Sequence, residues 1–408
     1  MSGEIYFDNN ATTQVAPEVF EAMRPYLTEL YGNPSSIHRF GSQVGRKIAE
    51  ARAQVASLIG TADPVEVIFT SCGTEGDNAA IRGMLEARPD KRHIVTTQVE
   101  HPAVLGLCQH LAKKGYRVTW LGVDQDGILD LDELRDALTV DTALVSIMAA
   151  NNETGVLFPI DKIGSIVKAR GIPFHVDAVQ AAGRLLLDMR ALPVDLLTVS
   201  AHKFYGPKGV GALYVRRGIT FPPFIIGGHQ ERNRRAGTEN VAGIIGMGRA
   251  AEIASACLAD DSERIGKLRD RFEESLLRSC PESRVNGHRQ SRLPNTSNVS
   301  FRYLEGESIL VLLDQQGICA STGSACTAGS SEPSHVLRAM GVAAEWLQGT
   351  VRFSLGRFNT GKEVDDVNQT LPAIVKRLQG LSALGKLQSQ EQPPVSRKRA
   401  AKSIAARG

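Results

Sequence analysis

Several signals that would assign this chain to a familiar class are missing. The six cysteines are scattered over 408 residues and no two form a Cys-X-X-Cys pair, so neither a disulfide framework nor a zinc knuckle is indicated. The sequence has no run of 18 apolar residues, and we expect no membrane-spanning helix. The start, MSGEIYFDNNATT, lacks the basic and apolar regions of a secretion signal. We therefore expect a cytoplasmic protein with reduced thiols.

The chain also has little net charge. It carries 47 basic and 44 acidic residues, for a net charge of +3, and this balance gives no reason to expect nucleic acid or an acidic membrane as a partner. The basic residues Arg397, Lys398 and Arg399 are better explained as part of a solvated tail. A Gly-X-Gly-X-X-Gly fingerprint is missing as well, because GPKGVG at 206–211 has a different spacing. A dinucleotide-binding fold is therefore disfavoured.

Short apolar segments that alternate with helical ones are present from about residue 65. Helices are predicted at 102–114, 130–138 and 161–170. Strands are predicted at 65–70, 94–98, 117–121, 143–149, 173–176 and 196–200, and a further strand at 209–216 is predicted to run back beside them. Such alternation predicts an α/β fold, with a mostly parallel sheet that has helices on both faces.

The remainder of the chain has a different character. A charged helix is predicted near 262–278, followed by a helix near 308–315, a strand at 350–355 and a last helix near 363–379. The length favours more than one domain. We expect a large domain over 15–258 and a smaller α+β domain formed by 1–14 and 259–380. Residues 386–408 are rich in Gln, Pro, Ser, Lys and Arg and are predicted to be disordered.

Two charged residues follow predicted strands, at the edge where such sheets place their ligand sites. Lys203 lies in SAHKFYGPKG and Asp177 in VDAVQ. Each has an alternative explanation, because the lysine could be a solvated charge and the aspartate a helix cap. Together they suit a pyridoxal phosphate site, in which a lysine binds a carbonyl and an aspartate keeps the pyridine nitrogen protonated. Gln180 could then donate to the phenolic oxygen of the ring.

Two loops near the predicted strands carry further candidates. The loop SCGTEGDN opens a helix, and free N–H groups at a helix N-terminus bind phosphate. Gly73 and Thr74 suit that use, although many strand–helix loops look alike. His101, in VEHPAV, precedes a helix that begins with proline. It is either a structural histidine or a group above the cofactor ring that moves protons near neutral pH.

A cysteine and two arginines complete the candidates. Cys326 lies in the Gly- and Ser-rich segment CASTGSACTAGSS, and it is either a passive exposed cysteine or a nucleophile on a movable arm. Cys319 is predicted to be packed. In TVRFSLGRFN, Arg352 suits a bidentate grip on a substrate carboxylate. Arg357 suits a structural ion pair.

These motifs together resemble the cysteine desulfurases, a branch of the fold-type-I pyridoxal phosphate enzymes. The resemblance runs from residue 6 to the last helix and leaves out the tail. The matching motifs are YFDNNATT, YGNPSSIH, TSCGTEGDN, VEHPAV, NNETG, VDAVQ, SAHKFYGPKG, RRAGTEN and GSACTAGSSEPSHVL. The long cysteine loop with EPSHVL resembles the class that supplies iron–sulfur assembly. GGHQERNRRAGTEN and TGSACTAGS are most similar to its nitrogen-fixation type, NifS, and the docking segment of the housekeeping type, IscS, is missing.

The resemblance implies a large domain with a seven-stranded, mostly parallel sheet and a small domain that carries the cysteine loop at about 318–335. Lys203 would hold pyridoxal phosphate as a Schiff base, and His101 would move protons. Asn152 and Arg352 would bind the substrate carboxylate. Cys326 would receive sulfur as a persulfide and is a possible transient iron–sulfur ligand. The implied cofactor contacts are Gly73, Thr74, Glu75, His101, Asn152, Asp177, Gln180, Ser200, His202 and Lys203, with Thr238 reaching across a homodimer.

The predicted function is conversion of L-cysteine to L-alanine, with transfer of the sulfur to an acceptor or scaffold protein for iron–sulfur, and in particular nitrogenase, cluster assembly. The alternatives are a housekeeping desulfurase, or a selenocysteine lyase or aminotransferase on the same fold. The last two do not require a cysteine in a mobile loop. A sulfur-relay or scaffold protein with a degenerate site is a different class, and the joint presence of Lys203, Asp177 and His101 disfavours it.

Overall fold

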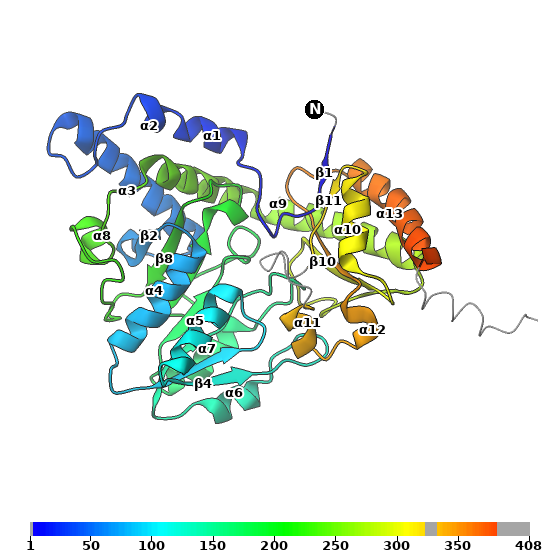
Figure 1. Ribbon diagram of the computed structural model, residues 1–408. Coiled ribbons are helices and arrows are strands. Elements are labelled where there is room, and N and C mark those ends of the chain that lie inside the picture. The colour runs from blue at the N-terminus through cyan, green and yellow to red at the C-terminus, as the bar shows by residue number, and fades with distance from the viewer. Residues whose placement is uncertain (1–2, 323–332, 382–408) are drawn as a thin grey trace, which may run out of the picture.

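A computed structural model gives the fold and describes residues 3–322 and 333–381 (Figure 1). Cys326 and the tail predicted to be disordered, 386–408, lie outside the described residues. A seven-stranded sheet has the strand order β2-β8-β7-β6-β5-β3-β4. Its strands are β2 (Val67–Thr70), β3 (His93–Thr97), β4 (Arg117–Leu121), β5 (Thr142–Ser146), β6 (Phe174–Asp177), β7 (Leu196–Ser200) and β8 (Gly211–Val215).

The direction of the strands confirms the predicted topology. Strand β8 runs antiparallel to both of its neighbours, β2 and β7, and the other neighbouring pairs are parallel. The central strands are buried along their whole length, as expected for a sheet that is covered on both faces. The predicted mostly parallel sheet, with one strand running back, is therefore confirmed.

Helices cover both faces of this sheet. Consecutive residues of β7 enter different clusters of apolar side chains, Leu196 on one face and Leu197 on the other, because side chains alternate along a strand. The first face is covered by α4 (Gly73–Glu86) and α5 (Pro102–Lys113). The second is covered by α3 (Arg39–Ile59), α7 (Ile160–Ala169) and part of α9 (Val241–Ser279). The remaining helices here are α1 (Pro17–Met23), α2 (Pro25–Thr28), α6 (Leu131–Ala137) and α8 (Gln230–Asn233).

A second hydrophobic core is built around a three-stranded antiparallel sheet of order β12-β10-β9. These strands are β9 (Ser283–Val285), β10 (Thr296–Phe301) and β12 (Thr350–Ser354), and the helices are α10 (Gly306–Asp314), α11 (His335–Ala339), α12 (Ala344–Leu347) and α13 (Gly361–Leu381). The N-terminal β1 (Ile5–Tyr6) pairs in parallel with β11 (Ile318–Cys319). Phe7 is buried in this second core, against Phe272. The division into two domains at residue 258 stays a prediction.

Helix α9 differs from the prediction. A helix was expected near 262–278, but α9 has 39 residues and begins at Val241. Its first half is rich in small residues, which hid the helical pattern but allow close packing. A Cβ atom on Gly248 would lie 2.6 Å from the Cα atom of Ala51 in α3. By length and a mean hydropathy of 1.4, part of α9 could span a membrane, but half of that window is buried inside the protein. We therefore assign α9 as a core helix.

Candidate active site

A cavity of about 240 Å³ lies at the carboxyl ends of the parallel strands, the edge at which sheets of this type bind ligands. Its walls come from the residues that follow β2, β3, β5, β6 and β7, and from Ala11 of the N-terminal segment. Most of the residues predicted for the site line it, namely Gly73, Thr74, His101, Asn152, Asp177, Gln180, Ser200, His202 and Lys203. The structure thus brings together residues that are spread over more than a hundred positions of the chain.

The first turn of α4 forms one end of the cavity. Cys72 precedes this 14-residue helix, and in the described part of the chain no side chain caps its N–H groups. Ser200 Oγ is buried beside this turn and has no hydrogen-bond partner among the described residues. A Cβ atom on Gly73 would lie 2.9 Å from Val179 Cγ2, so glycine keeps the turn close to the wall. Free N–H groups and an orphaned hydroxyl fit a phosphate group.

Two buried carboxyl groups lie in the wall of the same cavity. Asp177 ends β6, and its Oδ1 accepts a hydrogen bond from the Val179 N–H at 2.9 Å. Burial raises the pKa of Asp177 to about 6. Asp77, on α4, is also buried, and burial together with the nearby Asp177 raises its pKa well above the usual range. A carboxylate in such a dry place needs a cationic partner, and the protonated ring nitrogen of pyridoxal phosphate would supply one.

Asp77 was not singled out from the sequence, although it lies in the motif TSCGTEGDN. A charged residue near the start of a helix usually faces solvent. Here Gly76 lets the helix approach β7 so closely that a Cβ atom would lie 2.7 Å from Thr198 Cγ2. Two glycines at 73 and 76, three residues apart, were the available signal that this face of α4 is pressed against the sheet.

Lys203 follows β7 in a short 3-10 turn, Ala201–Lys203. Its Nζ atom donates hydrogen bonds to the backbone oxygens of Asn10 and Ala11, at 2.6 and 2.7 Å. The lysine charge lowers the pKa of Asp177 and also that of His101. The amine therefore lies close to both side chains with which it was predicted to act.

His101 precedes α5, and its Nδ1 accepts a hydrogen bond from the Ala103 N–H at 3.2 Å. The proton of the neutral ring is therefore on Nε2. Burial, with smaller contributions from Lys203 and His335, lowers the pKa of His101 to about 4. The ring is consequently neutral near pH 7 and has a hydrogen-bond donor on Nε2.

Two predicted cofactor contacts are placed differently. Glu75 does not line the cavity. Its carboxylate accepts hydrogen bonds from the Ser71 N–H at 2.8 Å and from Arg235 Nε at 2.9 Å, and so shapes the loop. Thr238 is exposed and lines a separate hollow beside Arg235. Its contact with a second subunit stays a prediction.

The two arginines of β12 and the following turn have different surroundings. Arg352 is buried behind the cavity wall. Its Nη2 pairs with Asp8 Oδ1 at 2.9 Å, and its Nη1 donates to the backbone oxygen of Asn152 at 3.0 Å. Arg357 Nε pairs with Asp261 Oδ2 at 2.7 Å, which confirms the predicted structural ion pair. A carboxylate-binding role for Arg352 stays a prediction.

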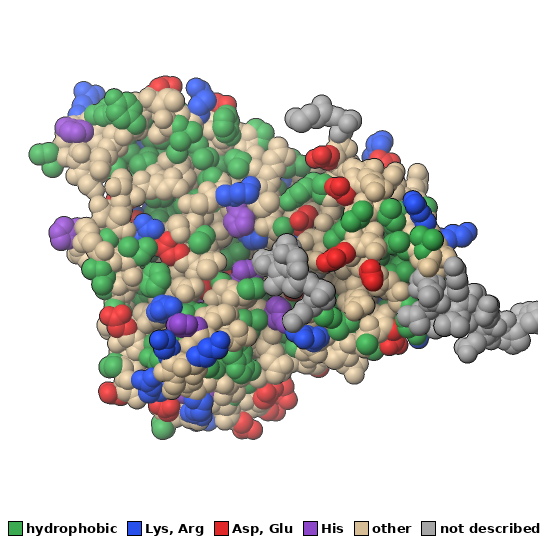
Figure 2. All heavy atoms as spheres, in the orientation of Figure 1, with side chains coloured by type: hydrophobic (Ala, Val, Ile, Leu, Met, Phe, Trp, Pro, Cys, Tyr) green, Lys and Arg blue, Asp and Glu red, His purple; other side chains and the backbone are tan. Residues whose placement is uncertain are grey.

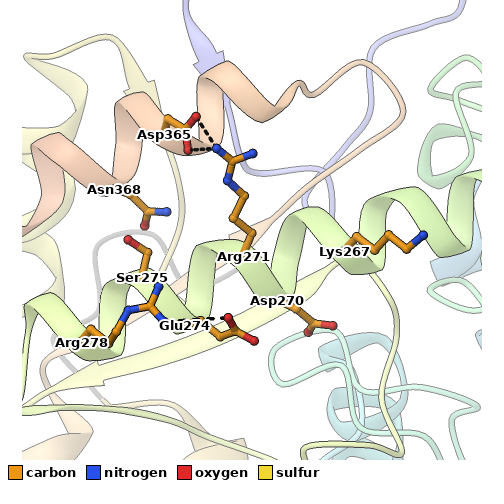
Figure 3. A pocket seen from close by; sticks show the side chains of 8 residues that line it. All are labelled: Lys267, Asp270, Arg271, Glu274, Ser275, Arg278, Asp365 and Asn368. Atoms are coloured by element: carbon orange, nitrogen blue, oxygen red, sulfur yellow. Dashed lines mark hydrogen bonds and ion pairs between the residues drawn. The ribbon is translucent and has the colours of Figure 1, made fainter.

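A second hollow lies between α9 and α13 and is lined mostly by charged side chains (Figure 3). These charges are already matched. Arg271 Nη2 lies 2.5 Å from Asp365 Oδ1, Arg278 pairs with Glu274 at 4.0 Å, and Lys267 pairs with Glu263 at 2.5 Å. Within residues 3–322 and 333–381, no group of three His, Cys, Asp or Glu side chains could hold a metal ion. The cavity around Lys203 is therefore the candidate active site.

A lysine and an aspartate that face one cavity beside an open helix N-terminus define an enzyme of the pyridoxal phosphate class. The family model "Aminotransferase class-V" matches residues 5–367. The chain is 58% identical to a cysteine desulfurase of Trichormus azollae, over 95% of this chain and 98% of that protein. It is 50% identical to the cysteine desulfurase NifS of Azotobacter vinelandii, over 93% and 94% of the two chains. A solved NifS-like protein, 41% identical, superposes with a TM-score of 0.87 over 92% of this chain and all of that one.

The chain belongs to the class-V aminotransferase family and, within it, to the cysteine desulfurases. This confirms the predicted family, fold class, cofactor and type of enzyme.

Proposed function

We propose that the protein converts L-cysteine to L-alanine and passes the sulfur to Cys326 and then to an acceptor protein. One observation carries the proposal: Lys203 and Asp177 face the same buried cavity as the open N-terminus of α4. Membership of the cysteine desulfurases supports the choice of substrate. The test is to measure alanine and reducible sulfur after adding L-cysteine to the holoenzyme. Equal amounts are expected, and amino transfer without alanine would contradict the proposal.

Pyridoxal phosphate, when bound, supplies an electron sink that stabilises negative charge at the substrate Cα. In the proposed arrangement, the first turn of α4 with Ser200 and His202 holds its phosphate, and Asp177 holds the ring nitrogen. Gln180 and Asn152 bind the phenolic oxygen. Lys203, besides anchoring the cofactor, takes the proton from the substrate Cα.

The sulfur transfer itself involves the thiol of Cys326. Its thiolate attacks the substrate sulfur, so that an S–S bond forms as the Cβ–S bond breaks, and the electrons of the broken bond remain with the three-carbon fragment that becomes alanine. His101, neutral and with its proton on Nε2, is proposed to donate a hydrogen bond to the substrate sulfur, which favours loss of the thiol proton. Cys326 leaves this step as a persulfide, from which the acceptor takes the outer sulfur atom.

Asp177→Asn is expected to stabilise the cofactor-free protein at pH 8 by about 3 kcal/mol. The folded-state pKa of Asp177, about 6, is above the ordinary value of 3.8. Protonation therefore contributes stability that is fully present below pH 3.8 and is lost as the pH rises through 6. Asparagine cannot ionise, so the variant avoids this loss. Urea unfolding at pH 4.5, 6 and 8 measures the difference, which should grow with pH.

The exposed Asp126 provides the control, and Asp126→Asn should change the free energy of unfolding little at any pH. If Asp177→Asn lowered the free energy of unfolding by the same amount at every pH, this result would contradict a buried Asp177 carboxyl with a raised pKa. The same variant should bind pyridoxal phosphate weakly, because the ring nitrogen loses its anionic partner.

We propose a homodimer whose contact surface includes α1, α2 and the segment before α3. Phe20, Leu27, Tyr31 and Ile37 are exposed there, and Figure 2 shows hydrophobic side chains over α1 and α2. An apolar patch of this kind on a protein surface usually marks an interface. In this arrangement Thr238 would contact the cofactor phosphate of the partner.

Leu27→Glu is expected to shift the protein to monomers, because a carboxylate buried at the contact would lack a partner. Sedimentation velocity measures the change. Val140, which is exposed in the loop after α6, gives the matched control Val140→Glu, and this variant should remain dimeric. Retention of the dimer in Leu27→Glu would place the contact elsewhere.

For the pathway, we propose iron–sulfur assembly of the nitrogen-fixation type in the cytoplasm, with Cys326 as a possible transient cluster ligand. The similarity to NifS supports this choice over the housekeeping alternative. We also propose that the two hydrophobic cores correspond to two domains, 15–258 and 1–14 with 259–380. Transfer of sulfur-35 from labelled cysteine to a purified scaffold protein tests the pathway.

A further inference from the structure

The side chain of Arg352 is incompletely satisfied although it is buried. Nη1 and Nη2 each make one hydrogen bond, to Asn152 O and to Asp8 Oδ1. Nε is buried and has no partner among the residues that the structure describes. A guanidinium group carries five N–H donors, and buried donors are normally paired. The side chain therefore has the capacity to bind a further anion or to exchange the one that it holds.

Asp8 belongs to the N-terminal segment that borders the active site. The segment follows β1, and Asp8 forms a parallel bridge with Ser354, the last residue of β12. Two residues further on, Asn10 and Ala11 accept the hydrogen bonds of Lys203 Nζ. Burial, the largest influence, raises the pKa of Asp8, while the charges of Arg352 and Lys203 act in the opposite direction. The Asp8 carboxylate thus interacts with Arg352, the residue predicted to bind the substrate carboxylate, and also feels the charge of Lys203.

We infer that Asp8 is a positioning residue. Its carboxylate pairs with Arg352 in place of the substrate carboxylate while no substrate is bound, and it is displaced when substrate binds. The inference rests on the proposed function and on the predicted role of Arg352 in binding the substrate carboxylate. Asp8 keeps the buried guanidinium paired while no substrate is present. The arrangement also makes binding selective, because a ligand must bring its own carboxylate to replace the one that it removes.

The test compares two ligands of the holoenzyme that differ in the carboxylate. 3-Mercaptopropionate has a carboxylate and a thiol, whereas cysteamine has an amine and a thiol but no carboxylate. In Asp8→Asn the shape is kept and the competing charge is removed. We expect the dissociation constant of 3-mercaptopropionate, measured by calorimetry, to fall about tenfold, because Arg352 is then available more of the time. The dissociation constant of cysteamine should stay within about twofold.

A second readout is thermal stability. Without ligand, Asp8→Asn leaves Arg352 with a neutral partner, so the midpoint of unfolding should fall. 3-Mercaptopropionate should then raise it by more than in the parent protein. If Asp8→Asn does not fold, Asp8→Ser is measured in the same way. Arg352→Gln provides the matched background, in which the Asp8→Asn effect on 3-mercaptopropionate should vanish, because Asp8 acts through Arg352.

Unchanged or weaker 3-mercaptopropionate binding in Asp8→Asn would overturn the inference. An equal gain for cysteamine would overturn it too, because the effect would then not depend on the carboxylate. Either result would leave the proposed function intact, since that depends on the formation of alanine from cysteine by the parent protein. A parent protein that makes no alanine would instead contradict the proposed function.

Discussion

Replacing Lys203 with alanine is expected to reduce the rate of alanine formation by about 10⁴-fold or more. The variant lacks the amine that is proposed to anchor pyridoxal phosphate and to take the substrate proton. Its backbone oxygen partners, Asn10 and Ala11, belong to the N-terminal segment. The purified protein should be colourless or should release its cofactor on gel filtration. Visible absorbance, with an assay of alanine, measures both effects.

Lys208 offers a matched control, because it lies five residues further on and is exposed. Lys208→Ala should keep the yellow colour and nearly full turnover. A Lys203→Ala protein that still binds the cofactor covalently, as shown by reduction with borohydride and mass spectrometry, would move the anchoring lysine elsewhere. The circular dichroism spectrum should be unchanged in both variants, so that loss of the band is not confused with loss of the fold.

Cys326→Ala is expected to bind pyridoxal phosphate and cysteine normally but to form alanine at least about 10³ times more slowly. The substrate sulfur has no thiolate to attack it in this variant, so the Cβ–S bond is not broken. The parent protein, treated with cysteine and then trypsin, should give a peptide that contains residue 326 and one extra sulfur atom. Mass spectrometry of that peptide and an alanine assay measure the two outcomes.

Cys257, a partly buried cysteine of α9, is the control. Cys257→Ala should keep turnover and the labelled peptide. Full alanine formation by Cys326→Ala would favour the alternative that the enzyme acts in the manner of a selenocysteine lyase, in which no protein thiol is needed. This experiment therefore separates the two functions that the fold can support.

The sequence predicted a helix or strand correctly where one local pattern determines its bounds. Strands at Arg117–Leu121 and Leu196–Ser200 have the predicted ends, because β-branched and apolar runs are bounded there by loop residues. The helix at Leu131–Ala137 begins after Asp130, whose carboxylate accepts the Asp132 N–H as expected. The helix predicted near 262–278 is part of α9, but the first half of α9 was not predicted, since it is buried against α3 and lacks the polar stripe from which helices are recognised.

The sequence predicted those residues of the candidate site whose positions follow from the topology of the sheet. Parallel strands end at one edge, so the residues after each strand, among them His101, Asp177 and Lys203, were expected to meet, and they do. The pair of Asp8 and Arg352 could not be foreseen, because the two residues lie 344 positions apart and meet only after the N-terminal segment joins the second core. The predicted contact of Thr238 with a second subunit stays a prediction, because it involves another chain.

Helix α9 has a consequence for how the protein can be divided. At a rise of about 1.5 Å per residue its 39 residues form a continuous rod of about 58 Å. Ile244 and Met247 anchor one end in the first core, and Phe272 and Leu276 anchor the other end in the second. A chain cut at residue 258 would sever this rod, and each fragment would expose an apolar surface that the intact protein covers. Heating should therefore melt both halves in a single cooperative transition, and neither half should be recoverable as a separately folded fragment.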